Sequence, residues 1–360
     1  MFKIVAEKGK ARAGILETMH GRIETPCLLP VATKGAAKLL TNNQLQEMGA
    51  QAIMTNSLLL YLRPGLQTIK RLGSLHDFFG WKKPVFTDSG GFQILAEQLF
   101  VGINNNGIRF KNPFSLQKMF FTPRNAIEIQ NALNSDVAFC LDHMPKANSP
   151  KEIALDSLQR TTKWARECKK THKNKKQLLF GIAQGSTFKE LRKRSCREIV
   201  EIGFQGYAIG GLSIGETSKK MLETIKESKK IFPREQAVHL MGVGSAKEIV
   251  QSISMGVDIF DSCYPTRMAR HATFFSGTKI LDVSKKNFEK EKKPLDKNCS
   301  CYTCKNHSAA LLHHLFKVKE QNSQLLLSIH NMHFALNLVQ QARKAIMGGR
   351  FKEFEKKWKS

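Results

Sequence analysis

The sequence predicts a (β/α)8 barrel of the α/β class, and three observations support this prediction. Eight short apolar runs rich in Val, Ile, Leu and Phe recur without strict alternation, as in strands buried on both faces of a parallel sheet. Amphipathic segments of helical period lie between them. The 360 residues leave room for a barrel with appendages or for two medium domains. An open doubly wound sheet is the alternative, but no glycine fingerprint supports it.

The expected elements alternate along the chain. Strands are expected at Cys27–Ala32, Ala52–Asn56, Val85–Asp88, Val137–Asp142, Leu179–Gln184, Tyr207–Gly211, Val238–Gly242 and Ile259–Ser262. Helices are expected at Ser149–Lys170, Thr187–Ile202, Glu216–Ile231 and Ser245–Met255. Two of these helices open with capping chemistry, because Ser149 precedes Pro150 and Ser245 is followed three residues later by Glu248.

Two stretches do not fit the alternation. The segment from Gln93 to about Ser135 is too long for one crossover, so we expect an insertion after the third strand. Beyond the eighth strand, the lysine-rich Lys285–Lys297 leads into a cysteine cluster and a helical tail. We therefore expect the barrel over residues 1–274, and a smaller subdomain with C-terminal helices packed on the barrel over residues 275–360.

The charge balance favours a polyanionic partner. The chain has 57 Lys and Arg residues against 30 Asp and Glu residues, a formal net charge of +27. Basic side chains placed on phosphates release condensed counterions, so the excess suits a nucleic acid. An AT-rich genome also enriches lysine, so the charge alone does not decide.

Nothing in the sequence predicts export or membrane insertion. The first ten residues contain no apolar stretch long enough for a signal peptide, and no window approaches the ~18 apolar residues of a membrane helix. Isolated cysteines are interpreted as small buried apolar residues of a reduced, cytoplasmic protein. These are Cys27, Cys140, Cys168, Cys196 and Cys263.

Polar residues stand where the expected strands end. In a parallel barrel these positions meet at one edge, the edge that carries active sites. Carboxylates converging there imply function or ion pairing, because an unpaired buried carboxylate costs several kcal/mol. Some could instead cap the following helices. The residues at or next to the strand ends are, in order, Asn56, Asp88, Asp142, Gln184, Gly211, Met241 and Asp261, of which five have polar side chains.

Two facing carboxylates suit chemistry at an acetal-like carbon. One can attack an anomeric centre and form a covalent glycosyl-enzyme, while the other handles protons. Gln184 and Asp142 offer hydrogen bonds in one plane, which suits a flat, purine-like ligand. Phe92 and Met241 could sandwich such a ring or could be plain core residues. The spacing alone predicts a barrel enzyme that acts on a glycosidic bond, such as that of a nucleoside.

The strongest local signal is a group of three cysteines within one short loop. Cys299, Cys301 and Cys304 supply three thiolates, and one further ligand completes a closed tetrahedron. Since protein atoms then fill every coordination position, we expect one structural Zn2+ in a C-terminal zinc-binding subdomain. The histidines available as fourth ligand are His307, His313, His314, His330 and His333.

Five motifs in a fixed order make the chain similar to one known family. They are TDSGGFQ at 87–93, FGIAQGS at 180–186, GGLSIGE at 210–216, MGVG at 241–244 and FDSCYPTR at 260–267. With the CxCxxC pattern followed by His330, they resemble the bacterial-type tRNA-guanine transglycosylases (queuine tRNA-ribosyltransferases). The match runs from about Glu24 to the C-terminal helices. The resemblance implies a (β/α)8 barrel with a zinc-binding subdomain, and it selects His330 as the fourth zinc ligand.

The resemblance also implies a reaction. Asp261 would attack the anomeric carbon of the wobble guanosine in GUN-anticodon tRNAs, forming a covalent ribosyl-Asp intermediate. Asp88 would be the general acid/base, and a 7-deazaguanine base would replace guanine, in queuosine biosynthesis. Bacterial relatives are commonly homodimers, so a homodimer is expected.

The same resemblance assigns binding roles to further residues. Asp142, Gln184 and the Gly211 backbone amide would recognise the base, with Glu216 orienting the Leu212–Ser213 peptide. The stacking pair would be Phe92 and Met241, and the contacts near the anticodon loop would come from Arg267 and Arg270.

Some positions depart from the family's pattern. Ile214 is bulky, which favours a small incoming base, 7-aminomethyl-7-deazaguanine. Met144 and Ser213 change the expected pocket wall and leave direct use of queuine open. His143 is interpretable either as a pocket residue or as a surface substitution. In addition, Asn56-Ser-Leu-Leu59 replaces the usual Asn-Thr-Tyr-His.

Two other functions compete with transglycosylation. A non-catalytic tRNA-binding subunit is one, but it has no use for both Asp88 and Asp261. A nucleoside hydrolase that passes the ribosyl group to water is the other. The zinc lobe and the net charge of +27 favour a macromolecular substrate over a free nucleoside.

Overall fold

Eight parallel strands close into a barrel in the computed structural model, which describes residues 1–95 and 97–358. Each strand pairs with the next in the chain, and the ring closes where Ala32 N–H donates to the Met54 carbonyl at 2.7 Å. The predicted fold class is confirmed. The barrel strands are β4 (Cys27–Pro30), β5 (Ile53–Asn56), β6 (Val85–Asp88), β10 (Val137–Phe139), β11 (Leu178–Ala183), β12 (Gly206–Ile209), β13 (Ala237–Leu240) and β14 (Ile259–Ser262).

Several strands end earlier than the apolar runs suggested. The strand expected to reach Asp142 ends at Phe139, and the one expected to reach Gly211 ends at Ile209. These apolar runs continue past the last ladder hydrogen bond, because the residues that follow stay buried in the loops of the carboxyl edge.

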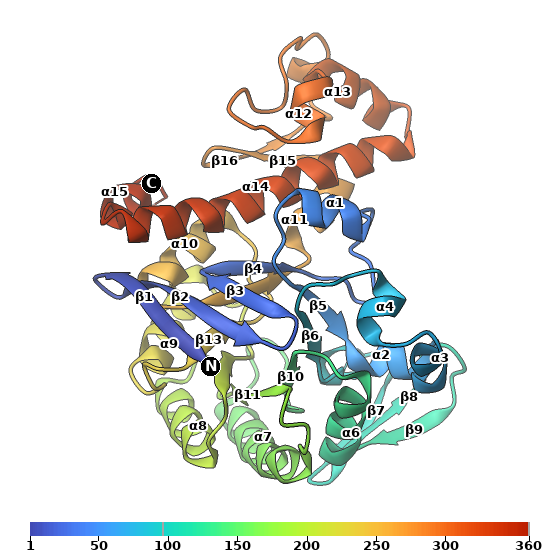
Figure 1. Cartoon of the computed structure of the whole chain (residues 1–360), viewed down its shortest axis with the longest axis vertical. Helices are drawn as coiled ribbons and strands as arrows, with labels where there is room; N and C mark the ends of the chain where they lie inside the picture. The colour runs from blue at the N-terminus through green and yellow to red at the C-terminus, as the bar shows by residue number, and fades with distance from the viewer. Residues whose placement is uncertain (96, 359–360) are drawn as a thin grey trace.

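Helices connect the strands and cover the barrel (Figure 1). Ser245 caps its helix as expected, accepting from Glu248 N–H at 3.3 Å. Ser149 does not cap, because its hydroxyl donates to the Lys146 carbonyl instead. The helices are α1 (Asn42–Glu47), α2 (Ser57–Leu62), α3 (Leu66–Arg71), α4 (Leu75–Phe79), α5 (Gly91–Ile94), α6 (Pro123–Leu133), α7 (Lys151–Thr171), α8 (Lys189–Ile202), α9 (Ser218–Lys229), α10 (Ala246–Ser254) and α11 (Tyr264–Arg270).

The stretch 93–135, expected as an insertion, contains two kinds of structure. Its first part forms an antiparallel sheet of β7 (Phe100–Asn104), β8 (Gly107–Lys111) and β9 (Lys118–Phe121). Its last part is α6, which links this sheet to β10 and packs beside α7. The Thr122 hydroxyl accepts from Asn125 N–H at 3.1 Å and so starts α6.

An antiparallel sheet that the sequence did not predict covers the amino end of the barrel. It consists of β1 (Phe2–Lys8), β2 (Ala11–Thr18) and β3 (Gly21–Thr25). Phe2, Leu16 and Ile23 from this sheet join the apolar core inside the barrel. Their burial removes apolar surface from water and closes the barrel floor.

A buried ion pair ties this floor to the last barrel strand. Arg12 on β2 contacts Asp258 with Nε–Oδ1 at 2.8 Å and Nη2–Oδ2 at 2.5 Å. Asp258 also accepts from Val238 N–H at 2.8 Å. Such a two-point contact stabilises the ion pair and also fixes the orientation of the guanidinium group relative to the carboxylate.

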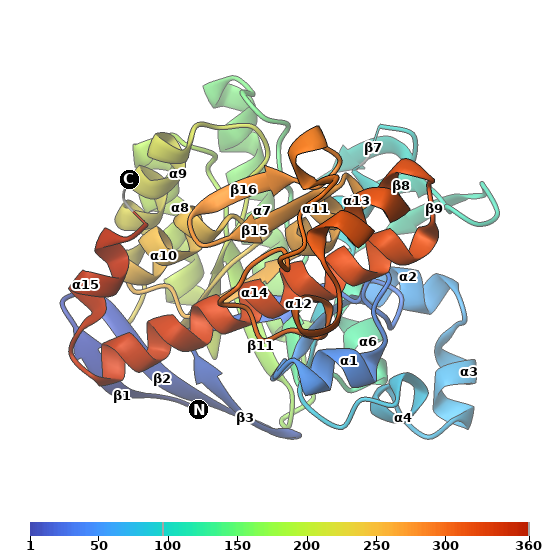
Figure 2. The same cartoon turned by 90° about the horizontal axis from the view of Figure 1, so that it is seen from above.

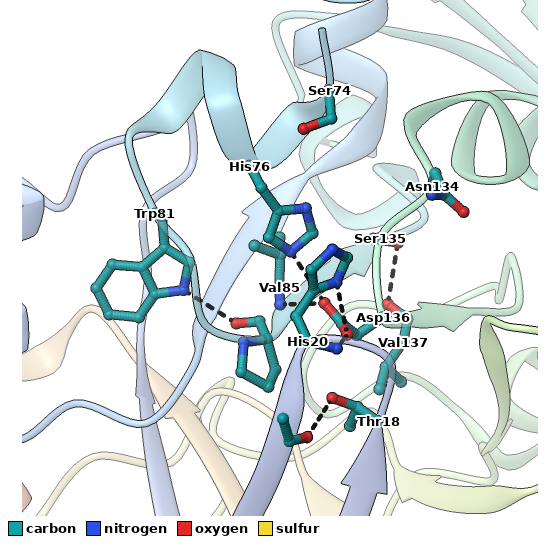
Figure 3. Close-up of polar contacts among 12 residues, drawn as sticks. Thr18, His20, Ser74, His76, Trp81, Val85, Asn134, Ser135, Asp136 and Val137 are labelled. Carbon is teal, nitrogen blue, oxygen red and sulfur yellow. Dashed lines mark hydrogen bonds and ion pairs between the residues drawn. The ribbon is translucent and has the colours of Figure 1, made fainter.

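A second tie joins the β2–β3 turn of the floor sheet to the barrel through Asp136, which directly precedes β10 (Figure 3). His20 Nδ1 lies 3.0 Å from Asp136 Oδ1, and His76 Nε2 lies 3.1 Å from Oδ2. The backbone N–H groups of His20 and Val85 also donate to this carboxylate, at 2.8 and 2.9 Å. The two imidazole rings are stacked with centroids 3.6 Å apart. Each of these ring nitrogens donates an N–H to the carboxylate, so Asp136 is satisfied by four hydrogen bonds.

We predict that Asp136→Asn lowers the free energy of unfolding by about 2 kcal/mol at neutral pH. Burial alone would raise the pKa of Asp136, but hydrogen bonds from His76, Val85 and His20 outweigh it and hold the pKa at about 2. The carboxylate thus contributes stability above the pKa of the unfolded chain, and this contribution is lost as the pH falls through about 2. Urea unfolding at several pH values measures the effect. The exposed Asp77→Asn is the control, and an equal loss in both variants would contradict the prediction.

The C-terminal part packs on the barrel through one long helix. Figures 1 and 2 show α14 (Gln321–Met347) running across the barrel, with α12 (Tyr302–Asn306) and α13 (Ala309–Lys317) on its other side. Leu327 of α14 and Leu28 of β4 belong to one continuous apolar core. The remaining elements are the hairpin β15 (Thr273–Ser276) and β16 (Lys279–Asp282), the 3-10 turn η1 (Lys286–Phe288) and α15 (Phe351–Lys356). Among the described residues, no helix is both long enough and apolar enough to cross a bilayer.

Candidate active site

Asp88 ends β6 at the carboxyl edge of the barrel, as the sequence predicted. Its Oδ1 accepts from Asn56 Nδ2 at 2.8 Å and from Gly90 N–H at 3.0 Å, and its Oδ2 lies 3.3 Å from Gln93 Nε2. Asn56 is fixed in turn because its Oδ1 caps α2, accepting from Leu59 N–H at 2.7 Å. These donors hold the carboxyl group in one orientation.

The electrostatic surroundings bring the pKa of Asp88 close to neutral pH. Burial is the larger cause and raises the pKa of Asp88 to about 7. The negative charges of Asp261 and Asp142 raise the pKa further, while hydrogen bonds from Gly90 and Gln93 oppose the rise. The structure therefore brings the three predicted carboxylates close enough to interact. A group that is half protonated at pH 7 can both give and take a proton there.

Asp142 and Gln184 form a joined hydrogen-bonding face beside it. Gln184 Nε2 donates to Asp142 Oδ2 at 2.5 Å, and burial raises the pKa of Asp142 to about 6. Gln184 Oε1 is buried and has no hydrogen-bond partner among the described residues. A Cβ at Gly211 would lie 2.3 Å from this oxygen, so glycine is required there. An unpaired buried acceptor next to a carboxylate suits a ligand that brings N–H donors.

Glu216 holds the loop that follows β12. Its two carboxylate oxygens accept from Ser213 N–H at 2.5 Å and from Ile214 N–H at 3.1 Å. Ser213 has a positive φ of 60°, a strained conformation for a residue with a side chain. Leu212 in the same loop is buried. Glu216 thus fixes the peptide that the resemblance assigned to it.

Asp261 lies on β14, across the barrel edge from Asp88. Its Oδ1 is 2.7 Å from His239 Nε2 and 3.3 Å from Gly242 N–H. No described residue donates a hydrogen bond to its Oδ2. His239 was not predicted as a site residue, because it lies inside an apolar run where a histidine gives no signal of its own. Only its alternation with Leu240 places it on the inner face of the strand.

The expected stacking and tRNA-contacting residues lie around this edge. Phe92 on α5 is 59% exposed, whereas Gly91 and Ile94 of the same helix are buried. Met241 follows β13 and packs partly against the barrel core. Arg267 and Arg270 lie in the last turn of α11, directly after β14, and neither forms an ion pair with a described residue. Their charges remain available to an anion.

His143 is buried beneath α7, so the surface alternative is wrong. Its Nδ1 lies 2.9 Å from Arg160 Nη1, and its carbonyl accepts from the Ser157 hydroxyl. Burial lowers the pKa of His143 to about 4, and the positive charge of Arg160 contributes to the decrease. The ring is therefore neutral at pH 7 and is fixed by α7.

Four ligand atoms near the C-terminus form a second polar cluster that could bind one metal ion. The Sγ atoms of Cys299, Cys301 and Cys304 and a ring nitrogen of His330 lie within 4.8 Å of one another. His330 Nε2 is 2.7 Å from the Phe275 carbonyl, so it donates there and leaves the Nδ1 lone pair for a metal. This donor set of three thiolates and one imidazole fits a tetrahedral ion.

The other histidines near this cluster are held differently. His313 Nδ1 lies 2.8 Å from the Val283 carbonyl, and the His307 ring packs against Tyr302. His333 lies beside the cluster, with Nδ1 3.6 Å from Cys299 Sγ and Nε2 3.3 Å from the Ser300 hydroxyl. His330 is thus the imidazole that lies among all three thiols.

Comparison with known proteins identifies the family. The family described as Queuine tRNA-ribosyltransferase matches residues 7–360. The chain belongs to this family. A protein named Queuine tRNA-ribosyltransferase from Thermotoga neapolitana is 40% identical over 356 residues, 99% of this chain and 96% of its own length.

Further members of the queuine tRNA-ribosyltransferase family are similarly close. Proteins with the same name from Halothermothrix orenii and Caldanaerobacter subterraneus are 41% and 42% identical over 345 and 350 residues. These matches cover 96% and 97% of this chain and 92% and 93% of the relatives. The family predicted from the motifs is confirmed, and the family's name is that of a pentosyltransferase.

Proposed function

We propose that this member of the family exchanges the wobble guanine of GUN-anticodon tRNAs for a 7-deazaguanine base, by double displacement through Asp261. The observation that carries the proposal is the pair Asp88 and Asp261. The two carboxyl groups interact across one edge of the barrel, one of them with a pKa near 7 and the other with an oxygen free of hydrogen bonds. A module that only binds tRNA has no need of this pair.

The first displacement forms the covalent intermediate. An electron pair of Asp261 Oδ2 forms a bond to the anomeric carbon as the glycosidic bond breaks, and the bonding pair leaves with guanine. Protonated Asp88 supplies the proton that neutralises the departing base. The ionised Asp261 also stabilises the positive charge that develops on the sugar before the bond forms.

The second displacement reverses these roles. The incoming base attacks the same carbon, its proton passes to ionised Asp88, and Asp261 leaves as a carboxylate. Two displacements at one carbon retain its configuration. The wobble base sits in a single-stranded loop, so moving it out of its stack costs little.

The recognition of the base follows from Asp142, Gln184 and Gly211. The carboxylate and the unpaired Gln184 Oε1 accept N–H groups, and the Gly211 backbone offers an amide at the same face. Guanine and its 7-deaza analogues present both donors and an acceptor along one edge. The half-buried Ile214 favours 7-aminomethyl-7-deazaguanine over the larger queuine, with Phe92 and Met241 as the stacking pair.

The positive charge of the protein, and the position of two arginines beside the proposed nucleophile, support tRNA as the macromolecular substrate. Arg267 and Arg270 follow the nucleophile strand directly, and the net charge of +27 favours a polyanion. A homodimer and a cytoplasmic location stay predictions of the sequence.

The metal in the cysteine cluster is proposed to be one structural Zn2+. Cys299, Cys301, Cys304 and His330 would fill all four positions of a tetrahedron, which leaves none for substrate. The ion would hold the loop before α12 against α14, within a C-terminal subdomain over residues 275–360 that packs on the barrel of residues 1–274. It supplies stability and no step of the exchange.

One assay tests the proposed function. The protein is incubated with radiolabelled guanine and an unmodified tRNA with a wobble guanosine, and label in the tRNA supports transglycosylation. Tight tRNA binding without exchange would indicate a binding subunit, and release of guanine without exchange would indicate a hydrolase. Competition with unlabelled 7-aminomethyl-7-deazaguanine and with queuine then decides which base the site prefers.

We predict that the two displacements depend on pH in opposite directions. Formation of the adduct needs protonated Asp88, so its rate should fall about tenfold per pH unit above pH 7, which is about the pKa of Asp88. Transfer to the incoming base needs ionised Asp88, so its rate should fall in the same way below pH 7. Single-turnover quench experiments at saturating tRNA and base measure each rate. Asp88→Asn should flatten both profiles, and profiles that change in the same direction would contradict the acid/base role.

A further inference from the structure

His239 lies within the barrel directly against the proposed nucleophile. Its side chain is completely buried on β13, and its Nε2 is 2.7 Å from Asp261 Oδ1. Its other ring nitrogen, Nδ1, is buried and has no hydrogen-bond partner among the described residues. Burying a polar ring is costly unless it is hydrogen-bonded, so the contact with Asp261 is what compensates for burying this side chain in the apolar core.

The ring has one polar partner, Asp261, in the part of the chain that the structure describes. Phe139 packs edge-on against it, with ring centroids 5.1 Å apart, and Phe86 lies at 6.2 Å. An ionised carboxylate only accepts hydrogen bonds, so the shared proton belongs to Nε2 and the ring is the donor. Held by two phenyl rings, the imidazole keeps this direction.

The two oxygens of Asp261 are therefore different. Oδ1 faces two donors, His239 Nε2 and the backbone N–H of Gly242, whereas no described residue donates to Oδ2. The Asp261 side chain is 14% exposed, and Oδ2 is its oxygen without a donor among the described residues, so Oδ2 keeps its lone pairs for a substrate.

We infer that His239 is a positioning residue for the transfer reaction, which fixes Oδ1 so that Oδ2 attacks the sugar. The inference rests on the proposed function. When Oδ2 bonds to the anomeric carbon, the departing base takes the electron pair of the glycosidic bond and a proton from Asp88. Oδ1 then becomes the carbonyl oxygen of the ester and keeps both hydrogen bonds. The imidazole gains and loses no proton in either displacement.

Two kinds of substitution separate positioning from packing. His239→Phe keeps a buried ring and removes the donor. We expect kcat and the rate of adduct formation to fall about 10²-fold, because a small misplacement of a reacting atom costs about this much in rate. The KM for tRNA and the Kd of the complex should stay within a factor of about two, because the ring is buried away from substrate. His239→Gln places an amide nitrogen near the position of Nε2 and should recover most of the rate. His239→Asn has the same group on a shorter side chain and should not.

His76→Phe is the matched control at the opposite end of the barrel. It removes the same type of hydrogen bond, from a buried histidine to Asp136, and should lower thermal stability with kcat unchanged. An unchanged kcat in His239→Phe would overturn the inference, as would equal activity in the Gln and Asn variants. A rise in KM that accounts for the whole loss would also overturn it. Should His239→Phe fail to fold, the comparison of the Gln and Asn variants decides. If the wild type exchanges no guanine, the proposed function fails instead.

Discussion

Asp261→Asn should lower the rate of guanine exchange by at least about 10⁴-fold and remove the covalent tRNA adduct. The amide cannot supply the electron pair that forms the ester, nor the negative charge that stabilises the sugar cation. The amide oxygen of the asparagine can still accept hydrogen bonds from His239 and Gly242, so the fold should be retained. The adduct is measured on denaturing gels with end-labelled tRNA, and exchange is measured with labelled guanine.

The control for this variant is Asp77→Asn, on the exposed side of α4 and away from the carboxyl edge. It should exchange guanine at the wild-type rate. Binding of tRNA should be similar in both variants, because the Asp261 carboxylate is not placed to hold phosphate. A tenth or more of the wild-type exchange rate in Asp261→Asn would remove this residue as nucleophile.

Cys301→Ala should lower the metal content to near zero and the free energy of unfolding by about 4 kcal/mol or more. Cys301 is buried, and its Sγ lies 3.6 Å from His330 Nδ1 and accepts from Cys304 N–H at 3.4 Å. Loss of one thiolate leaves three ligands, which bind zinc far more weakly than four. Metal analysis of the purified protein and urea unfolding measure the two effects.

Cys196→Ala provides the comparison, since this cysteine is fully buried in α8 and distant from the cluster. It should keep the metal and lose about 1 kcal/mol, the cost of a small cavity. The fraction of Cys301→Ala protein that is folded should keep most of the wild-type exchange rate, because the metal takes no part in the reaction. Unchanged zinc stoichiometry in Cys301→Ala would contradict the ligand set.

Local sequence patterns predicted the barrel and the polar residues at its carboxyl edge well, because each strand and its last residues form one short, continuous segment. Buried parallel strands are nearly continuous apolar runs, so Val85–Asp88 and Ile259–Ser262 were predicted with the observed bounds. The carboxyl ends of parallel barrel strands converge by topology alone, so Asp88, Asp142 and Asp261 could be grouped from their positions in the sequence. The metal-binding cluster could be predicted from the spacing of its three cysteines alone.

Features that depend on distant partners could not be predicted in this way. The floor sheet joins residues 2–25 to the barrel through contacts such as Arg12 with Asp258, and neither residue signals the other in the sequence. The same holds for His239, whose role depends on Asp261 of the next strand. Apolar runs also overestimated strand length, because residues such as Leu141 stay buried after the ladder ends.

The floor sheet also sets an order of events for a chain that emerges from the ribosome. Arg12 meets Asp258 only after 246 further residues are made, and Gly14 and Thr25 accept from Arg343, 329 and 318 residues later. The strands of this sheet can pair with one another early, but closing such long loops is slow, so its contacts with the barrel and α14 form only after Arg343 has been synthesised. During that interval Phe2, Leu16 and Ile23 lack the barrel residues that bury them in the folded protein, so this sheet presents apolar surface that favours aggregation.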